Sequence, residues 1–108
     1  MGELMTGTAS QVEWAVLIKR RVADEFDRVA KAFAEVALKQ SVEDRADTEA
    51  TISILNEKRA AVMAIDQAGY FISTWQDLSG KVRDAIAADP RYQAIKADRE
   101  RRRRLPKP

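Results

Sequence analysis

The 108-residue sequence contains no cysteine and no histidine. The chain therefore forms no disulfide, builds no Cys/His zinc site and offers no thiol or imidazole for catalysis. Glycine (4) and proline (3) are scarce, which argues against a turn-rich sandwich or barrel. Apolar runs stay well below the ~20 residues that a membrane-spanning helix needs. Hydrophobic residues make up 45% and charged residues 33%, a balance typical of one small globular domain.

The residue types that remain define no chemical site. Carboxylates are plentiful, but no spacing singles out a catalytic pair, and the sequence has no Gly-rich phosphate loop. The acidic cluster lacks the spacing of a calcium loop and is better explained by helix capping; it consists of Glu43, Asp44, Asp47 and Glu49. We therefore expect a non-enzymatic protein with no cofactor and no metal.

A long helix is predicted over residues 10–40, which neither glycine nor proline interrupts. At 1.5 Å per residue it would be roughly 45 Å long. Ser10 and Glu13 fit a capping box at its start. Apolar residues recur at spacings of three and four and define one buried face; they are Ala15, Ile18, Val22, Phe26, Val29, Phe33 and Val36.

A second long helix is predicted from about Thr48 to Leu78, after a polar segment over residues 41–48. Ser41, Asp44 and Asp47 are alternative caps for its start. Gly69 lies inside this helix and indicates either a close helix contact or a kink, because glycine costs ~1 kcal/mol relative to alanine there.

Gly80 is predicted to close the second helix in the left-handed conformation. A short helix over residues 81–88 should direct Val82 and Ile86 inward. Asp89 and Pro90 then indicate a cap and first position of a helix over residues 90–104. The fold class is all-α: a long antiparallel helical hairpin with one or two short C-terminal helices, which assembles into a helical bundle. Residues 1–9 are expected to be disordered, 10–98 to form the helical domain and 99–108 a basic tail.

Six large apolar residues lie off the main stripes, namely Trp14, Leu17, Ile52, Met63, Tyr70 and Phe71. Burying ~100 Å² of each at ~25 cal/mol per Å² contributes on the order of 10–15 kcal/mol, which is comparable to the whole stability of a domain. We therefore predict a homo-oligomer, most simply a dimer, that presents helix faces to an unidentified protein partner. Tyr70 and Phe71 are placed on a surface patch, because both cannot face inward together with Ile72.

The C-terminal end is strongly basic. Of 19 basic and 17 acidic residues, six and one fall in residues 99–108, which gives +5 there and −3 in residues 1–98. The alternative function is a small nucleic-acid accessory protein that holds the phosphate backbone. Its contacts would come from Arg99, Arg101, Arg102, Arg103, Arg104 and Lys107. A solvated end that aids solubility is the other interpretation. The first eleven residues lack the basic and apolar regions of a signal peptide, so we expect a cytoplasmic protein with no membrane partner.

Overall fold

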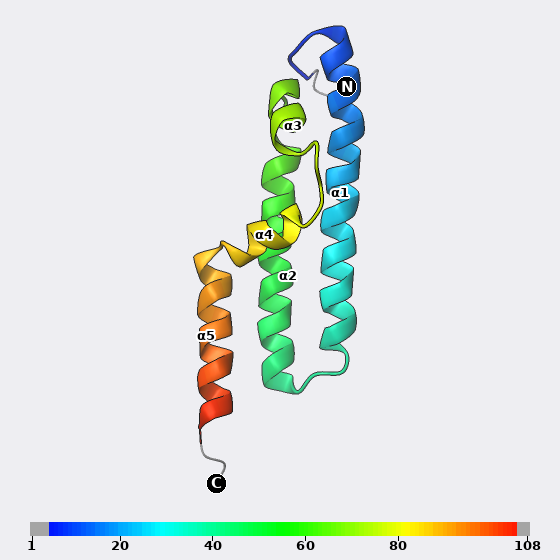
Figure 1. Cartoon of the computed structure of the whole chain (residues 1–108). Helices are drawn as coiled ribbons and strands as arrows, with labels where there is room; N and C mark the ends of the chain where they lie inside the picture. The colour runs from blue at the N-terminus through cyan, green and yellow to red at the C-terminus, as the bar shows by residue number, and fades with distance from the viewer. Residues whose placement is uncertain (1–4, 106–108) are drawn as a thin grey trace.

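Two long helices, α1 (Ala9–Ala37) and α2 (Val42–Met63), run side by side in opposite directions (Figure 1). They belong to a computed structural model that describes residues 5–105. Three shorter helices follow: α3 (Ala68–Thr74), α4 (Lys81–Ala87) and α5 (Pro90–Arg104). Within the described range the regular elements are all helices. The predicted all-α fold, built on an antiparallel hairpin with short C-terminal helices, is confirmed.

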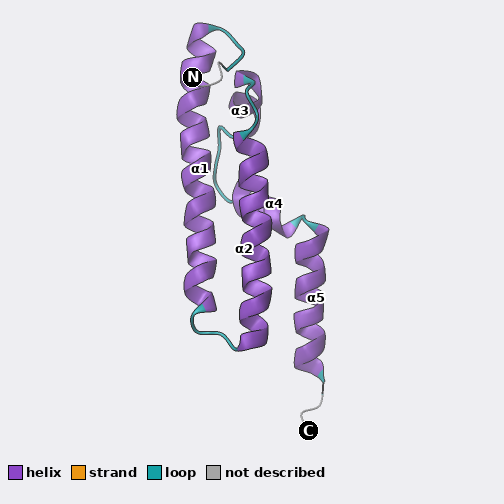
Figure 2. Ribbon diagram, turned by 180° about the vertical axis from the view of Figure 1, so that it is seen from behind, coloured by secondary structure: helices purple, strands orange, loops and turns teal. Residues whose placement is uncertain are grey.

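The short helices pack on the hairpin at three different levels. α3 continues beyond the end of α2 beside the first turns of α1, and α4 crosses the hairpin near its middle (Figure 1). α5 then runs antiparallel to α2 on the side away from α1, as both ribbon views show (Figure 2). The described chain measures 64 × 22 × 22 Å. One long side of α1 is therefore left without a neighbouring helix.

The N-cap of α1 is Thr8, two residues before the predicted cap Ser10. The Thr8 hydroxyl accepts a hydrogen bond from the Gln11 amide at 3.2 Å, and the Gln11 side chain accepts one from the Thr8 amide at 3.0 Å. This pair is a capping box, so the prediction of Ser10 with Glu13 is wrong. The sequence contains both pairs, and tertiary contacts of the preceding residues select the earlier one.

Those contacts attach residues 5–8 to the connection between α2 and α3. The Thr6 amide donates to the Asp66 carbonyl at 2.7 Å, and the Ala68 amide donates to the Thr6 carbonyl at 2.9 Å. Gly7 has φ +144°, and a Cβ there would lie 3.0 Å from the Ala68 Cβ. Residues 5–8 of the segment expected to be disordered are therefore hydrogen-bonded against the bundle; residues 1–4 lie outside the described range.

The stripe predicted on α1 is buried over most of its length. Its first five members, Ala15 to Val29, are each at most 4% exposed. Phe33 is half-buried, and Val36 is 53% exposed, so its predicted burial is wrong. Ala37 takes the buried position instead. The reason is that α3 and α4 lie beside the upper and middle parts of α1, so α2 is the helix that runs along its last turns.

The second predicted helix is divided in two. α2 starts after Ser41, whose hydroxyl accepts from the Asp44 amide, and it ends at Met63 rather than near Leu78. The Lys19 ammonium donates a hydrogen bond to the Ile65 carbonyl at 3.2 Å. Because α2 ends at Met63, this carbonyl has no partner within the helix, and the lysine supplies one. Open space surrounds Gly69, which is neither a close contact nor the kink. The break is fixed by partners distant in sequence, which local pattern does not reveal.

The C-terminal elements agree closely with their sequence signals. Gly80 is left-handed, with φ 74°, although it starts α4 instead of closing the preceding helix. Val82 and Ile86 are 1% and 3% exposed, as predicted. The Asp89 carboxylate caps α5 by accepting from the Arg91 amide at 2.8 Å, with Pro90 in the first turn.

Candidate interaction surfaces

The predicted interface residues do not form one surface. Trp14 and Leu17 on α1 are 46% and 51% exposed. Ile52, Met63 and Tyr70 are half-buried. Trp14 and Leu17, on successive turns of α1, are therefore the two of these residues that are exposed.

Phe71 is fully buried, so its placement on a surface patch is wrong. It packs edge-on against Tyr70, with ring centroids 5.2 Å apart, and the Lys19 ammonium lies 5.6 Å from its ring centroid. The Tyr70 hydroxyl accepts a hydrogen bond from the Trp75 indole at 3.0 Å. The error follows from treating residues 48–78 as one helix, because the interruption before α3 changes which side of the chain faces α1.

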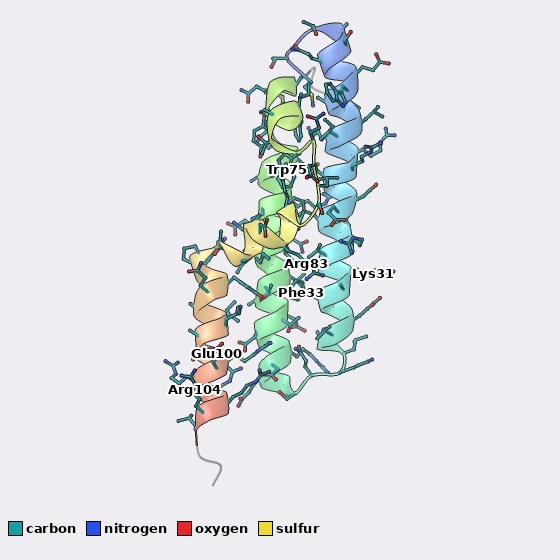
Figure 3. The ribbon with its side chains drawn as sticks, in the orientation of Figure 1. Lys31, Phe33, Trp75, Arg83, Glu100 and Arg104 are labelled. Atoms are coloured by element: carbon teal, nitrogen blue, oxygen red, sulfur yellow. The ribbon has the colours of Figure 1, made fainter. Side chains whose placement is uncertain are left out.

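A shallow apolar depression lies between α1 and α4. Its lining residues are Ala32, Phe33 and Val36 of α1 and Arg83 of α4. Figure 3 shows Arg83 and Phe33 near each other there. The sequence pattern missed this feature, because it placed Val36 in the core and gave Arg83 no role.

The basic segment and the acidic cluster, treated separately in the sequence, contact each other. The Arg102 guanidinium donates to Asp47 at 2.5 Å and to Asp44 at 3.3 Å. The Arg99 guanidinium donates to the Asp44 carbonyl at 3.0 Å, and its side chain is 25% exposed. Arg102 also lies 3.6 Å from Glu43. We call Arg99 and Arg102 with these three carboxylate residues the α2–α5 latch.

Helix dipoles explain why the latch charges lie at these helix ends. The carboxylates occupy the first turns of α2, where the helix end is electropositive, and the arginines occupy the last turns of α5, where it is electronegative. The helices are antiparallel, so the two ends meet. The hydrogen bond to Asp47 holds the pKa of Arg102 above its usual value. Each set of charges therefore stabilises its own helix and attracts the other.

The other predicted phosphate-binding residues within residues 5–105 make no ion pair with α2, although Arg103 borders the start of α2 together with Ser41, Glu43 and Asp44. Arg101 contacts Asp98, and Arg104 lies 3.9 Å from Glu100 on the exposed side of α5 (Figure 3). Arg103 is exposed and takes part in no ion pair within residues 5–105. Lys107 lies outside the described residues.

A second charged cluster fixes the start of α5. Asp89 is 7% exposed, and its carboxylate lies 3.0 Å from both Lys58 of α2 and the Arg91 guanidinium. The hydrogen bonds from Arg91 and then Lys58 hold the pKa of Asp89 well below its usual range, against the opposing effect of burial. Arg91 also reaches Glu57 at 2.6 Å. This cluster joins the start of α5 to α2.

Residues 5–105 contain no group of three or more acidic side chains arranged to hold a metal ion. None of the helices in that range is both long and apolar enough to cross a membrane. Comparison with protein-family models, curated proteins and solved structures finds no match to this chain. The function must therefore be argued from the surfaces themselves.

Proposed function

We propose that this chain is a non-enzymatic helical interaction protein that self-associates and presents helix faces to a protein partner. The observation that supports it is the side of α1 without a neighbouring helix. Trp14 and Leu17, two large apolar residues, are about half exposed there on successive turns. Exposed apolar groups gathered on one side of a helix favour association, whereas single scattered ones are ordinary.

Phosphate binding by the C-terminal arginines is the second candidate. It is less well supported, because Arg99 and Arg102 already hold carboxylates on α2. A polyanion would need to compete with three nearby carboxylates for these two arginines. Arg101, Arg103 and Arg104 are three exposed cations on α5, which is a small footprint for sequence-independent backbone binding.

Sedimentation equilibrium between about 1 and 300 µM tests the first candidate. We expect a mass above the 12.2 kDa of one chain. Leu17→Glu should shift the protein to the monomer and leave its helical circular dichroism unchanged. Ala60→Glu, at an exposed position of α2, is the matched control and should leave association intact. A wild-type monomer across the whole range overturns self-association.

A binding assay separates the second candidate. Fluorescence anisotropy with random-sequence DNA and RNA at low salt should give no binding if phosphate contact is not the function. Binding that disappears in Arg101→Gln/Arg103→Gln/Arg104→Gln would instead support it.

A further inference from the structure

The α2–α5 latch neutralises the basic end of the described chain. Residues 98–104 contain five arginines together with Asp98 and Glu100, which gives this segment a net charge of +3. The three latch carboxylates on α2 bring the net charge of the cluster to zero. Attraction of a phosphate backbone depends on net positive charge, so the end of α5 attracts a polyanion only weakly while the latch is closed.

The last turns of α5 can leave α2 while the start of the helix stays in place. Tyr92 and Ile95, which pack against the core, lie in the first half of α5, and Asp89 joins its start to α2. The last turns are joined to α2 by the hydrogen bonds and ion pairs of Arg99 and Arg102, whose side chains are 25% and 28% exposed. Partly exposed ion pairs are weak, so this end of α5 opens more readily than its start.

We propose that the latch is an autoinhibitory contact: the carboxylates at the start of α2 occupy arginines of α5, and release of its last turns exposes a helix that binds the phosphate backbone of a nucleic acid. Opening frees Arg99 and Arg102 and joins them to the three arginines of α5 that are exposed in the closed state. The inference goes beyond self-association, because it involves none of the exposed apolar residues of α1.

The latch itself shows which chemistry this end of α5 binds. The Arg102 guanidinium donates to the carboxylates of Asp47 at 2.5 Å and Asp44 at 3.3 Å. The Arg99 Nε lies 3.6 and 3.5 Å from oxygens of Asp44 and Asp47. Guanidinium groups bind phosphate oxygens as they bind carboxylate oxygens, so the two compete for the same donors. The apparent affinity for nucleic acid is then reduced by the fraction of molecules in which the latch is open.

A nucleic acid fits the open end of α5 better than an anionic membrane does. A helix that lies on a membrane surface needs an apolar face beside its basic one. The large apolar side chains of α5, Tyr92 and Ile95, already pack against the core, and residues 99–104 contain only arginine and one glutamate. Consecutive arginines project on all sides of a helix, which suits contact with phosphates rather than with base edges.

Asp47→Asn tests the proposal, because asparagine has nearly the same shape and lacks the charge that holds Arg102. Fluorescence anisotropy with a random-sequence DNA duplex of about 20 base pairs, in about 50 mM sodium chloride, measures the dissociation constant. We expect Asp47→Asn to bind about three- to tenfold more tightly than the wild type, because a larger fraction of its molecules have an open latch.

Glu49→Gln is the matched control. Glu49 belongs to the same acidic cluster, is exposed and forms no ion pair within residues 5–105. Its replacement changes the net charge by the same amount as Asp47→Asn and leaves the latch closed. The DNA affinity of Glu49→Gln should therefore stay within about twofold of the wild type. An equal gain in both variants would be an effect of net charge alone and overturns the proposal.

Amide hydrogen exchange in residues 97–104 shows whether the latch has opened. It should rise in Asp47→Asn and keep its wild-type rate in Glu49→Gln, with helical circular dichroism unchanged in both. Faster exchange without tighter DNA binding overturns autoinhibition. Unchanged exchange in Asp47→Asn also overturns it, because Asp47 would then not hold α5 in place.

Co-sedimentation with vesicles that contain about 30% phosphatidylserine separates a membrane from a nucleic acid. Asp47→Asn should bind the duplex and remain in the supernatant with the vesicles. Binding to the vesicles without binding to the duplex overturns the assignment to nucleic acid. Sedimentation equilibrium of Asp47→Asn should match the wild type, so a failure of the proposed self-association and a failure of this inference appear in different experiments.

Discussion

Arg102 and Asp47, 55 residues apart in the sequence, lie 2.5 Å apart in the structure. Their contact joins the last turns of α5 to the first turns of α2. No residue of α5 is fully buried, and Tyr92 and Ile95 pack half-buried against the core, so ion pairs supply much of the remaining contact with α2. The basic segment that resembles a free tail in the sequence is, over residues 99–104, the end of a helix held by carboxylates.

Arg102→Gln should loosen α5 without unfolding the hairpin. Removing the charge breaks the contacts with Asp47 and Asp44, and exposed ion pairs contribute modestly, so we expect amide hydrogen exchange in residues 95–104 to rise roughly two- to fivefold. Sodium chloride at about 0.5 M should have a similar effect on the wild type, because it screens the same charges.

Arg103→Gln is the control for this experiment, since Arg103 is exposed and forms no ion pair in the described part of the chain. It should leave exchange in residues 95–104 unchanged. Equal exchange in wild type and Arg102→Gln would mean that the latch does not hold α5.

Asp89→Asn should lower stability at neutral pH by an amount that disappears in acid. Asparagine still caps the helix, but it lacks the charge that faces Lys58 and Arg91. The pKa of Asp89 is lowered in the folded state, so its contribution is complete above the unfolded value of about 3.9 and is lost as the pH falls below it. The difference in Tm between wild type and variant should therefore be present at pH 7 and close below about pH 4. A difference that stays constant across this range contradicts the charge effect.

The sequence predicts those features of the fold that are determined by residues close together in the chain, and misses those determined by residues far apart. Features that depend on neighbouring residues are predicted correctly. They are the cap at Asp89, the burial of Val82 and Ile86, and the burial of the first five stripe residues of α1. The break before α3 is decided by Thr6 and Lys19, each more than 40 residues away. No local pattern carries that information.

The candidate surfaces are less predictable for the same reason. Trp14 and Leu17 are exposed, as expected from their position off the stripe. The orientation of Phe71 depends on the break before α3, so a pattern that misses the break also misplaces this side chain. Pairing Arg102 with Asp47 requires knowing that α5 returns beside α2, although the two complementary charge clusters are visible in the sequence.

Phe71→Ala should lower the unfolding free energy, whereas Trp14→Ala should weaken self-association. Phe71 is fully buried, so truncating it leaves a cavity and should cost about 3–5 kcal/mol of unfolding free energy. Trp14 is 46% exposed, so its truncation should change the stability of the monomer little and weaken self-association. Urea denaturation at low protein concentration measures the first quantity, and sedimentation measures the second. A Phe71→Ala variant that is stable but monomeric would contradict the burial of Phe71 and place it on the association surface.

Replacing Gly69 and Gly7 by alanine should have opposite effects on stability, through helix propensity at Gly69 and through backbone strain at Gly7. Gly69 lies in α3, and a Cβ added there would project into open space, so Gly69→Ala should stabilise the protein by about 0.5–1 kcal/mol through helix propensity. Gly7 has φ +144° and a Cβ there would meet Ala68 at 3.0 Å, so Gly7→Ala should destabilise it by about 1–2 kcal/mol. Thermal unfolding of both variants measures the difference. Similar Tm values would mean that residues 5–8 do not hold the α2–α3 connection in solution, because the strain at Gly7 would then be released by detaching that segment.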